Sequence, residues 1–336
     1  MRPEVPWSEC LAEAGSSSRL GLGTYNFDRG VDEAASSRLI AEFIELGGRL
    51  IDTSNSYAAG HAEHLVGLAL KGRRHEQAFV ATKVGWPLDA TSNSGGLSRS
   101  HVTEQCEASL RRLNRDCIDL YQLHRPDPAV PIEETLLAMA DLKRAGKIAF
   151  VGTSNFSAGQ LARAVEIGAQ VGISPISEQS AYNLLDRRVE LDLIPCCKSR
   201  GVSLVVWGAL AGGMLTGKYQ SVSGLPAGSR AARSPIYREE RLSNRALEVC
   251  STFCAVAAEF GYAPAELGLR WVLTNASVRT VVIGPKTSSQ LGELMTACEP
   301  LADPCLLEQL DRLVRPGTYV APFYEPNKKP DGRLAS

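Results

Sequence analysis

Short, nearly unbroken apolar segments alternate along the chain with longer stretches in which apolar residues recur every three or four positions. The short segments contain few polar residues, which is typical of strands covered on both faces. The longer stretches have the periodicity of amphipathic helices. Strands are predicted over residues 20–24, 50–53, 79–84, 118–123, 148–152, 176–179, 203–207 and 278–283.

Helices are predicted over residues 33–46, 62–71, 100–113, 132–144, 158–167, 188–199, 242–260 and 264–273. Strands in regular alternation with helices favour a closed (β/α)8 barrel, the TIM-barrel form of the α/β class, over an open sheet. We expect a single domain over residues 1–336 with long loops at the carboxyl face. The segment 210–241 is rich in Gly, Ser and Arg and shows little periodicity, so it is predicted as an inserted loop, and its part 230–241 as a mobile loop over this face. The proline-rich residues 315–336 are predicted as an extended tail laid over the barrel.

Composition narrows the class of protein. The 336 residues are 44% hydrophobic and 22% charged, and 36 Lys and Arg against 37 Asp and Glu leave a formal net charge of -1. This balance argues against a nucleic-acid or membrane binder that works by bulk charge. The first nineteen residues carry Glu4, Glu9 and Glu13 and lack a signal-peptide pattern. With nine cysteines and no CxxC pair, we expect reduced thiols and a cytoplasmic protein.

Polar side chains follow three consecutive predicted strands, where a barrel of this class places its chemistry. Asp52 ends the second strand and Tyr57 follows it, Lys83 lies at the end of the third, and His124 follows the fourth. Each alone has an ordinary explanation as a turn, a solvated lysine or a packed histidine. Together, a Tyr beside a Lys and a His is expected to have a lowered phenol pKa and to act as a proton donor. The pattern predicts protonation of a carbonyl oxygen during hydride transfer.

A second candidate site follows the eighth predicted strand. No GxGxxG motif follows the first strand, so a Rossmann-type nucleotide site is not expected. Gly284, Lys286 and several hydroxyl residues instead open a helix, an arrangement typical of phosphate binding, although a capped helix with a solvated lysine has the same pattern. His61 and His64 lack a third ligand at suitable spacing, and no metal site is predicted.

Several motifs resemble the aldo-keto reductase family, in the family's order and over nearly the whole chain. They lie at residues 19–24 (RLGLGT), 51–57 (IDTSNSY), 81–83 (ATK), 118–127 (IDLYQLHRPD), 146–156, 179–184 and 212–219. The resemblance implies a catalytic tetrad of Asp52, Tyr57, Lys83 and His124. It also implies that NADPH reduces an aldehyde or ketone to an alcohol.

The same resemblance implies a set of NADP-binding residues. Ser154, Asn155 and Gln179 are expected to hold the nicotinamide carboxamide, and Trp207 to stack on the nicotinamide ring. Lys286 is expected at the 2'-phosphate, with Gln290 and Glu293 near the adenosine. The other implied cofactor residues are Gly23, Thr24, Asp52, Gly208, Leu210, Gly212, Leu215, Lys218 and Gly284. The chain departs from the family pattern at Gly208-Ala209, where Ser-Pro is common, and at Leu294, where Asn is common.

Tyr25, Trp86 and Arg99 are the candidate substrate contacts. Trp86 is expected to form an aromatic wall, and Arg99 either binds an anionic substrate or caps the next helix. Two alternatives remain open: a sugar-modifying reductase, including one that reduces enones of nucleotide-linked sugars, and a cofactor-binding regulatory subunit like the channel-associated members of the family. The expected partner is a small carbonyl or sugar substrate. A phosphosugar isomerase is disfavoured because no Glu base stands at a matching strand end.

Overall fold

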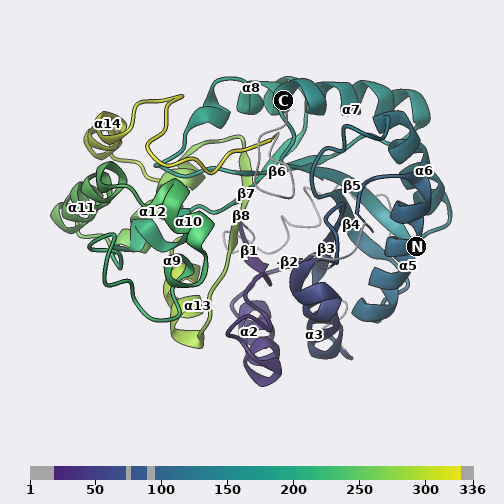
Figure 1. Ribbon diagram of the computed structural model, residues 1–336, viewed down its shortest axis with the longest axis horizontal. Helices are drawn as coiled ribbons and strands as arrows, with labels where there is room; N and C mark the ends of the chain where they lie inside the picture. Colours follow the sequence, from purple (N-terminus) through teal and green to yellow (C-terminus); the bar gives the residue numbers. More distant parts are fainter. Residues whose placement is uncertain (1–18, 73–76, 89–94, 327–336) are drawn as a thin grey trace.

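The structure is a computed structural model that describes residues 19–72, 77–88 and 95–326. Eight parallel strands close a barrel in sequence order. They are β1 (Leu20–Gly23), β2 (Leu50–Asp52), β3 (Phe79–Val84), β4 (Ile118–Leu123), β5 (Ile148–Ser154), β6 (Ser177–Ala181), β7 (Ser203–Trp207) and β8 (Val278–Ile283). Figure 1 shows the strands at the centre and the helices around them. The predicted (β/α)8 barrel is confirmed.

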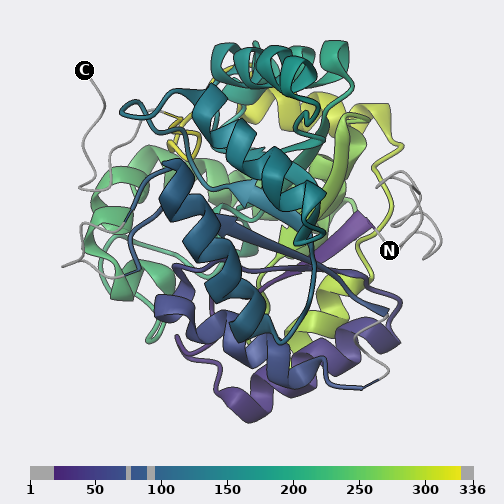
Figure 2. The same ribbon diagram turned by 90° about the vertical axis from the view of Figure 1, so that its right-hand side faces the viewer.

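Helices follow each strand and cover the outside of the barrel. The longer ones are α2 (Glu33–Glu45), α3 (His61–Ala69), α5 (Arg99–Leu113), α6 (Ile132–Arg144), α7 (Ala158–Val171), α8 (Leu193–Arg200), α11 (Asn244–Glu259), α12 (Pro264–Thr274), α13 (Ser288–Met295) and α14 (Pro304–Leu313). Figure 2 looks onto the side where α5, α6 and α7 pack against one another. Within the described ranges, no single helix is long and apolar enough to cross a membrane; α11 and α12 pass that test only as a pair bent by 92°.

The alternation of side chains along the strands places a polar layer above an apolar one inside the barrel. Leu50, Phe79, Ala81, Leu120 and Val205 form a buried apolar cluster of their own. Side chains two positions further along a strand point to the same face. Two positions after Leu50, Ala81, Leu120 and Val205, on β2, β3, β4 and β7, come Asp52, Lys83, Gln122 and Trp207. The apolar cluster therefore supports a layer of polar groups at the carboxyl ends of the strands.

Three parts of the prediction are corrected. The segment 188–199 is two helices, η3 (Arg188–Glu190) and α8, because Pro195 is tolerated only in the first turn of α8. Residues 210–241 are not a loop throughout but contain η4 (Ala211–Thr216), α9 (Arg230–Arg233) and α10 (Pro235–Arg241). The prediction lacked α14, although Asp303 and Pro304 are a strong start signal: the Asp303 carboxylate caps two backbone N–H groups.

The described part of the C-terminal segment (315–326) is a strap that contacts the loop after β6 and α10. The buried Asp186 carboxylate accepts hydrogen bonds from the backbone N–H groups of Phe323 and Tyr324, at 2.5 and 2.7 Å. The Arg241 guanidinium donates to the carbonyl of Pro322 at 2.6 Å. These contacts tie the strap to the loop after β6 and to α10. Residues 1–18 and 327–336 lie outside the described part of the chain.

One buried carboxyl is expected to make stability depend on pH. Glu178 on β6 is fully buried, and this burial raises its pKa from 4.5 to about 7 against the opposing hydrogen bonds from Ser180, Thr153 and the backbone. A raised pKa means that the folded protein holds the proton more tightly than the unfolded chain. Stability is therefore highest below the unfolded pKa and falls as pH rises towards about 7.

Replacing Glu178 with Gln is expected to remove this dependence. Urea unfolding at pH 5 and pH 8 should show a loss of about 2–3 kcal/mol at the higher pH that is smaller in Glu178→Gln. The exposed Glu259→Gln is the matched control and should behave like wild type. Equal pH dependence in all three proteins would contradict the role of Glu178.

Candidate active site

A buried ion pair lies at the centre of the polar layer. The ammonium of Lys83 donates to the Asp52 carboxylate at 2.6 Å and to the carbonyl of Thr53 at 2.9 Å, and both side chains are almost fully buried. Gln179 and Gln122 donate to the other Asp52 oxygen at 2.7 and 3.4 Å. Burial alone would lower the pKa of Lys83, but Asp52 and Tyr57 raise it above its ordinary value. Lys83 therefore stays charged, and Asp52 is held by three donors.

Tyr57 meets this pair from a left-handed turn. Ala58, Ala59 and Gly60 have φ values of 49°, 53° and 91°, and this turn directs the preceding Tyr57 towards Lys83. The Lys83 ammonium donates to the phenol oxygen at 3.3 Å. Burial raises the pKa of Tyr57, and the opposing effect of Lys83 does not outweigh it. The expectation of a lowered phenol pKa is therefore wrong: desolvation dominates, and Tyr57 is protonated at neutral pH.

His124 completes the group. Its ring packs edge-on against Tyr57, with centroids 5.9 Å apart, and its Nδ1 lies 3.1 Å from the hydroxyl of Ser54. Burial, followed by the charges of Lys83 and Arg125, holds the pKa of His124 well below its ordinary value. The imidazole is therefore neutral. The four residues predicted from strand ends thus lie together.

The ends of β5, β6 and β7 bring the predicted carboxamide and ring contacts together. The Trp207 indole N–H donates to the side-chain carbonyl of Asn155 at 3.2 Å. The Asn155 amide donates to the hydroxyl of Ser154 and to the carbonyl of His124, both at 3.0 Å. Asn155 itself has a positive φ of 58°. This network links Asn155 and Trp207 to the backbone of His124, while the Gln179 amide donates to Asp52.

The loop after β7 and the start of α13 gather cationic side chains. Burial, followed by the neighbouring Arg230 and Arg233, lowers the pKa of Lys218; burial, Arg233 and Lys218 lower that of Lys286. Arg230 and Arg233 therefore lie near Lys218, and Arg233 and Lys218 lie near Lys286. Within the described ranges, none of the four forms an ion pair with a carboxylate. This group, here called the cation cluster, is suited to bind phosphates.

The backbone around the cation cluster contains glycines that allow tight turns. Gly208, Gly212 and Gly213 have positive φ values, and a Cβ on Gly213 would lie 2.1 Å from the Lys218 ammonium. Glycine at these positions therefore lets the loop turn back on itself and bring Lys218 inward. The other predicted cofactor residues lie at the end of β1, at η4 after β7, just after β8 and on α13. They are Gly23, Thr24, Leu210, Leu215, Gly284, Gln290 and Glu293.

Two of the three predicted substrate residues lie next to the tetrad. The Tyr25 ring packs edge-on against Tyr57 with centroids 5.3 Å apart, and Trp86 packs in the same way against His124 at 6.2 Å. Arg99 is different. It opens α5, and its guanidinium forms an ion pair with Asp141 on α6. The helix begins one residue earlier than predicted, and the Arg99 side chain bridges two outer helices; a contact with an anionic substrate stays a prediction.

Comparison with known proteins identifies the family. Residues 19–314 match the Aldo/keto reductase family. The chain belongs to this family. It is 35% identical over 306 residues to an uncharacterized oxidoreductase, YrpG, of Bacillus subtilis, covering 88% of this chain and 91% of the relative. It is 33% identical over 310 residues to a probable voltage-gated potassium channel subunit beta of Arabidopsis thaliana (89% and 93%). The aldo-keto reductase YhdN of Bacillus subtilis is 33% identical over 293 residues (84% and 86%).

Membership of the aldo/keto reductase family supports an oxidoreductase role that uses a nicotinamide nucleotide. The residues of this chain fit such a cofactor. The cation cluster has donors for phosphates, the glycine-rich loop admits close backbone approach, and Trp207 offers an aromatic face beside Asn155.

Sequence reasoning missed four contributors to the candidate site. Ser54 and Gln122 are buried polar residues that contact His124 and Asp52. Arg230 and Arg233 belong to the cation cluster, in a segment predicted only as a loop. The serines that cap α9 and α10, Ser229 and Ser234, are a local signal for these short helices.

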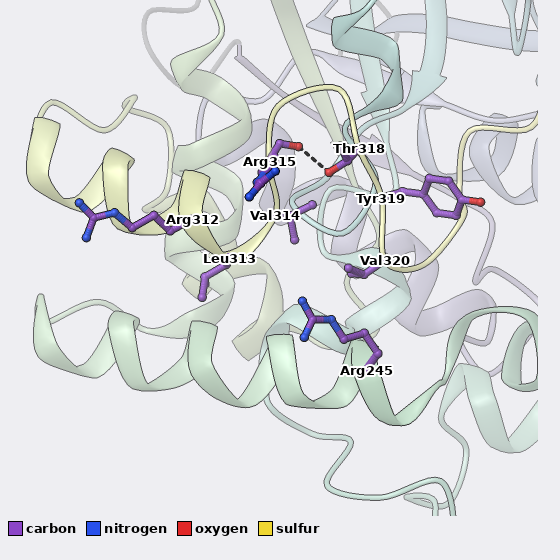
Figure 3. A pocket seen from close by; sticks show the side chains of 8 residues that line it. All are labelled: Arg245, Arg312, Leu313, Val314, Arg315, Thr318, Tyr319 and Val320. Atoms are coloured by element: carbon purple, nitrogen blue, oxygen red, sulfur yellow. Dashed lines mark hydrogen bonds between the residues drawn. The ribbon is translucent and has the colours of Figure 1, made fainter.

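A hollow near the strap does not include any residue of the tetrad. A hollow of about 650 Å³ between α11, α14 and the strap is lined by Arg245, Arg312, Leu313, Val314, Arg315, Thr318, Tyr319 and Val320. Figure 3 shows that Arg312 points away from the other side chains, and none of the eight belongs to the tetrad.

Among the described residues, no group of three or more His, Cys, Asp or Glu could hold a metal ion, and the eight described cysteines are free.

Proposed function

We propose that this chain is an NADPH-dependent carbonyl reductase that converts an aldehyde or ketone to an alcohol. The observation that carries the proposal is a buried series of contacts next to a neutral His124. In it the Lys83 ammonium lies 2.6 Å from the Asp52 carboxylate and 3.3 Å from the Tyr57 hydroxyl. A protonated phenol and a neutral imidazole at one place suit the two needs of a carbonyl oxygen, orientation and a proton.

Each residue of the tetrad has its own role in the proposed reaction. NADPH, when bound, supplies the hydride for the carbonyl carbon. Tyr57 gives its proton to the carbonyl oxygen, and His124 orients that oxygen by a hydrogen bond. Lys83, which stays charged because Asp52 is its partner, stabilises the phenolate that remains on Tyr57. Water is kept from the centre by burial: Lys83 is fully buried and Asp52 nearly so.

The preference for NADPH over NADH rests on charge. The 2'-phosphate distinguishes the two nucleotides, and an anion of this kind suits the cation cluster of Lys218, Arg230, Arg233 and Lys286. Asn155, Ser154 and Gln179 would hold the carboxamide, and Trp207 the nicotinamide ring. Gln290 already accepts a hydrogen bond from the backbone N–H of Lys286 at 2.8 Å, which holds that loop in place.

The proposal is tested by following NADPH absorbance with a reactive aromatic aldehyde. Turnover supports carbonyl reduction. NADPH binding without turnover would move the search to sugar enones, the double-bond alternative. Failure to bind NADPH would overturn the cofactor assignment.

Replacing Lys286 with Met is expected to weaken NADPH binding about 10- to 100-fold, because a charge-assisted contact to the 2'-phosphate is lost. NADH binding should change little. Fluorescence titration with both nucleotides measures this, with the exposed Lys198→Met as the matched control. Equal losses for NADPH and NADH would place Lys286 away from the 2'-phosphate.

A cofactor-binding regulatory subunit is the second candidate. The similarity to a probable channel beta subunit over 89% of this chain favours it. It predicts tight NADPH binding, no turnover on any carbonyl and purification with a protein partner.

A further inference from the structure

Ser54 is a buried residue outside the tetrad whose side chain contacts His124. It lies between Asp52 and Tyr57 in the sequence, and its side chain is fully buried. Its hydroxyl oxygen is 3.1 Å from His124 Nδ1 and 3.0 Å from the hydroxyl of Ser56. The backbone N–H of Ser56 donates to the same oxygen at 3.3 Å. Ser54 therefore joins the histidine to the turn that carries Tyr57.

A neutral imidazole carries one proton, on one of its two nitrogens. Nδ1 faces Ser54, so Nε2 is the nitrogen left for a carbonyl oxygen. A carbonyl oxygen only accepts hydrogen bonds. His124 can therefore orient it only in the tautomer with the proton on Nε2, and the other tautomer would set a lone pair against the oxygen.

The contacts of Ser54 favour the tautomer that the reaction needs. The Ser54 oxygen already accepts from the Ser56 N–H, and the Ser56 hydroxyl lies close enough to donate to it as well. The Ser54 proton is then free to donate to Nδ1. An Nδ1 that accepts a hydrogen bond is unprotonated, and the imidazole proton is placed on Nε2.

The other groups around His124 do not set the tautomer by hydrogen bonding to its ring. Asn155 donates to the backbone carbonyl of His124 rather than to the ring. The rings of Tyr57 and Trp86 lie edge-on to it. The charges of Lys83 and Arg125 disfavour the imidazolium but do not choose between the two nitrogens. The remaining titratable neighbour of this group, Asp52, is paired with Lys83.

We propose that Ser54 is a positioning residue that holds His124 in the tautomer protonated on Nε2, supported by Ser56. The functional role of this tautomer rests on the proposed carbonyl reduction, but measuring the tautomer does not require that the protein turns over a substrate. Ser54 acts through His124 and touches no reacting atom. No covalent step is involved: the hydroxyl donates a hydrogen bond and keeps its proton.

The decisive measurement is the ¹⁵N spectrum of the full chain with labelled histidine. The chain has five histidines, and the resonances of His124 are assigned by their loss in His124→Gln. Wild type should show a protonated Nε2 and an unprotonated Nδ1. Ser54→Ala should show a mixture of tautomers. A wild-type proton on Nδ1, or an unchanged pattern in Ser54→Ala, would overturn the proposal whether or not the protein turns over a carbonyl substrate.

Kinetics give the second readout. Ser54→Ala should lower kcat/KM about fivefold to tenfold, the effect of one hydrogen bond, without a change in NADPH affinity. Ser54→Thr keeps the hydroxyl and should restore both the ¹⁵N pattern and the rate. Ser56→Ala leaves the backbone donor in place and should keep the wild-type tautomer; if it moves the proton to Nδ1, the direction of the hydrogen bond proposed here is wrong.

Discussion

Replacing Tyr57 with Phe is expected to lower kcat by about 10²- to 10⁴-fold and to leave NADPH binding close to that of wild type. The variant keeps the ring that packs against Tyr25 and His124 and removes only the hydroxyl that Lys83 contacts at 3.3 Å. Burial raises the pKa of this phenol, so the wild-type rate should hold through neutral pH and fall only in alkaline solution, where the proton is lost. Single-turnover and steady-state rates with an aromatic aldehyde measure this.

Tyr262→Phe is the matched control, because Tyr262 lies at the turn between α11 and α12 and Arg270 stacks on its ring rather than its hydroxyl. It should keep the wild-type rate. If Tyr57→Phe also keeps it, the proton comes from another group and the proposed role of Tyr57 is wrong. If Tyr57→Phe loses NADPH binding as well, the phenol holds the nucleotide rather than the reacting oxygen.

The strands and the tetrad were predictable because barrel geometry turns a local pattern into a spatial one. Apolar runs such as residues 204–207 (LVVW) locate a strand covered on both faces, and the carboxyl ends of parallel strands meet at one mouth. Asp52, Lys83 and His124 were therefore brought together by their place in the strands alone. The inward alternation from Leu50 to Asp52 and from Ala81 to Lys83 fixes which side chains enter the polar layer.

The parts that failed depend on contacts that no local pattern contains. The short helix α10 exists because Tyr237 is buried and its hydroxyl donates to the carbonyl of Ala211 at 2.6 Å; helices of this length are marginal alone. The direction of the Tyr57 pKa shift depends on whether desolvation of the phenol exceeds the effect of the Lys83 charge. The sequence does not contain the depth of burial that decides this.

Replacing Lys83 with Met is expected to damage both stability and turnover. Asp52 has 3% side-chain exposure, and without Lys83 it would be a buried carboxylate held only by two amides. Removing one member of a buried pair destabilises by about 3–5 kcal/mol. The rate should fall by at least about 10²-fold, because the phenolate left on Tyr57 loses its cation. Urea unfolding and aldehyde reduction measure the two effects.

The double variant Asp52→Asn with Lys83→Met separates stability from chemistry. It removes both charges, and the Asn carbonyl can still accept from Gln179, so most of the lost stability should return while turnover stays low. Lys147→Met is the control, because its pair with Glu107 at 3.2 Å is half exposed and should contribute less than about 1 kcal/mol. Recovery of turnover along with stability would mean that Lys83 serves only to neutralise Asp52, whereas stability without turnover assigns its charge to the reaction.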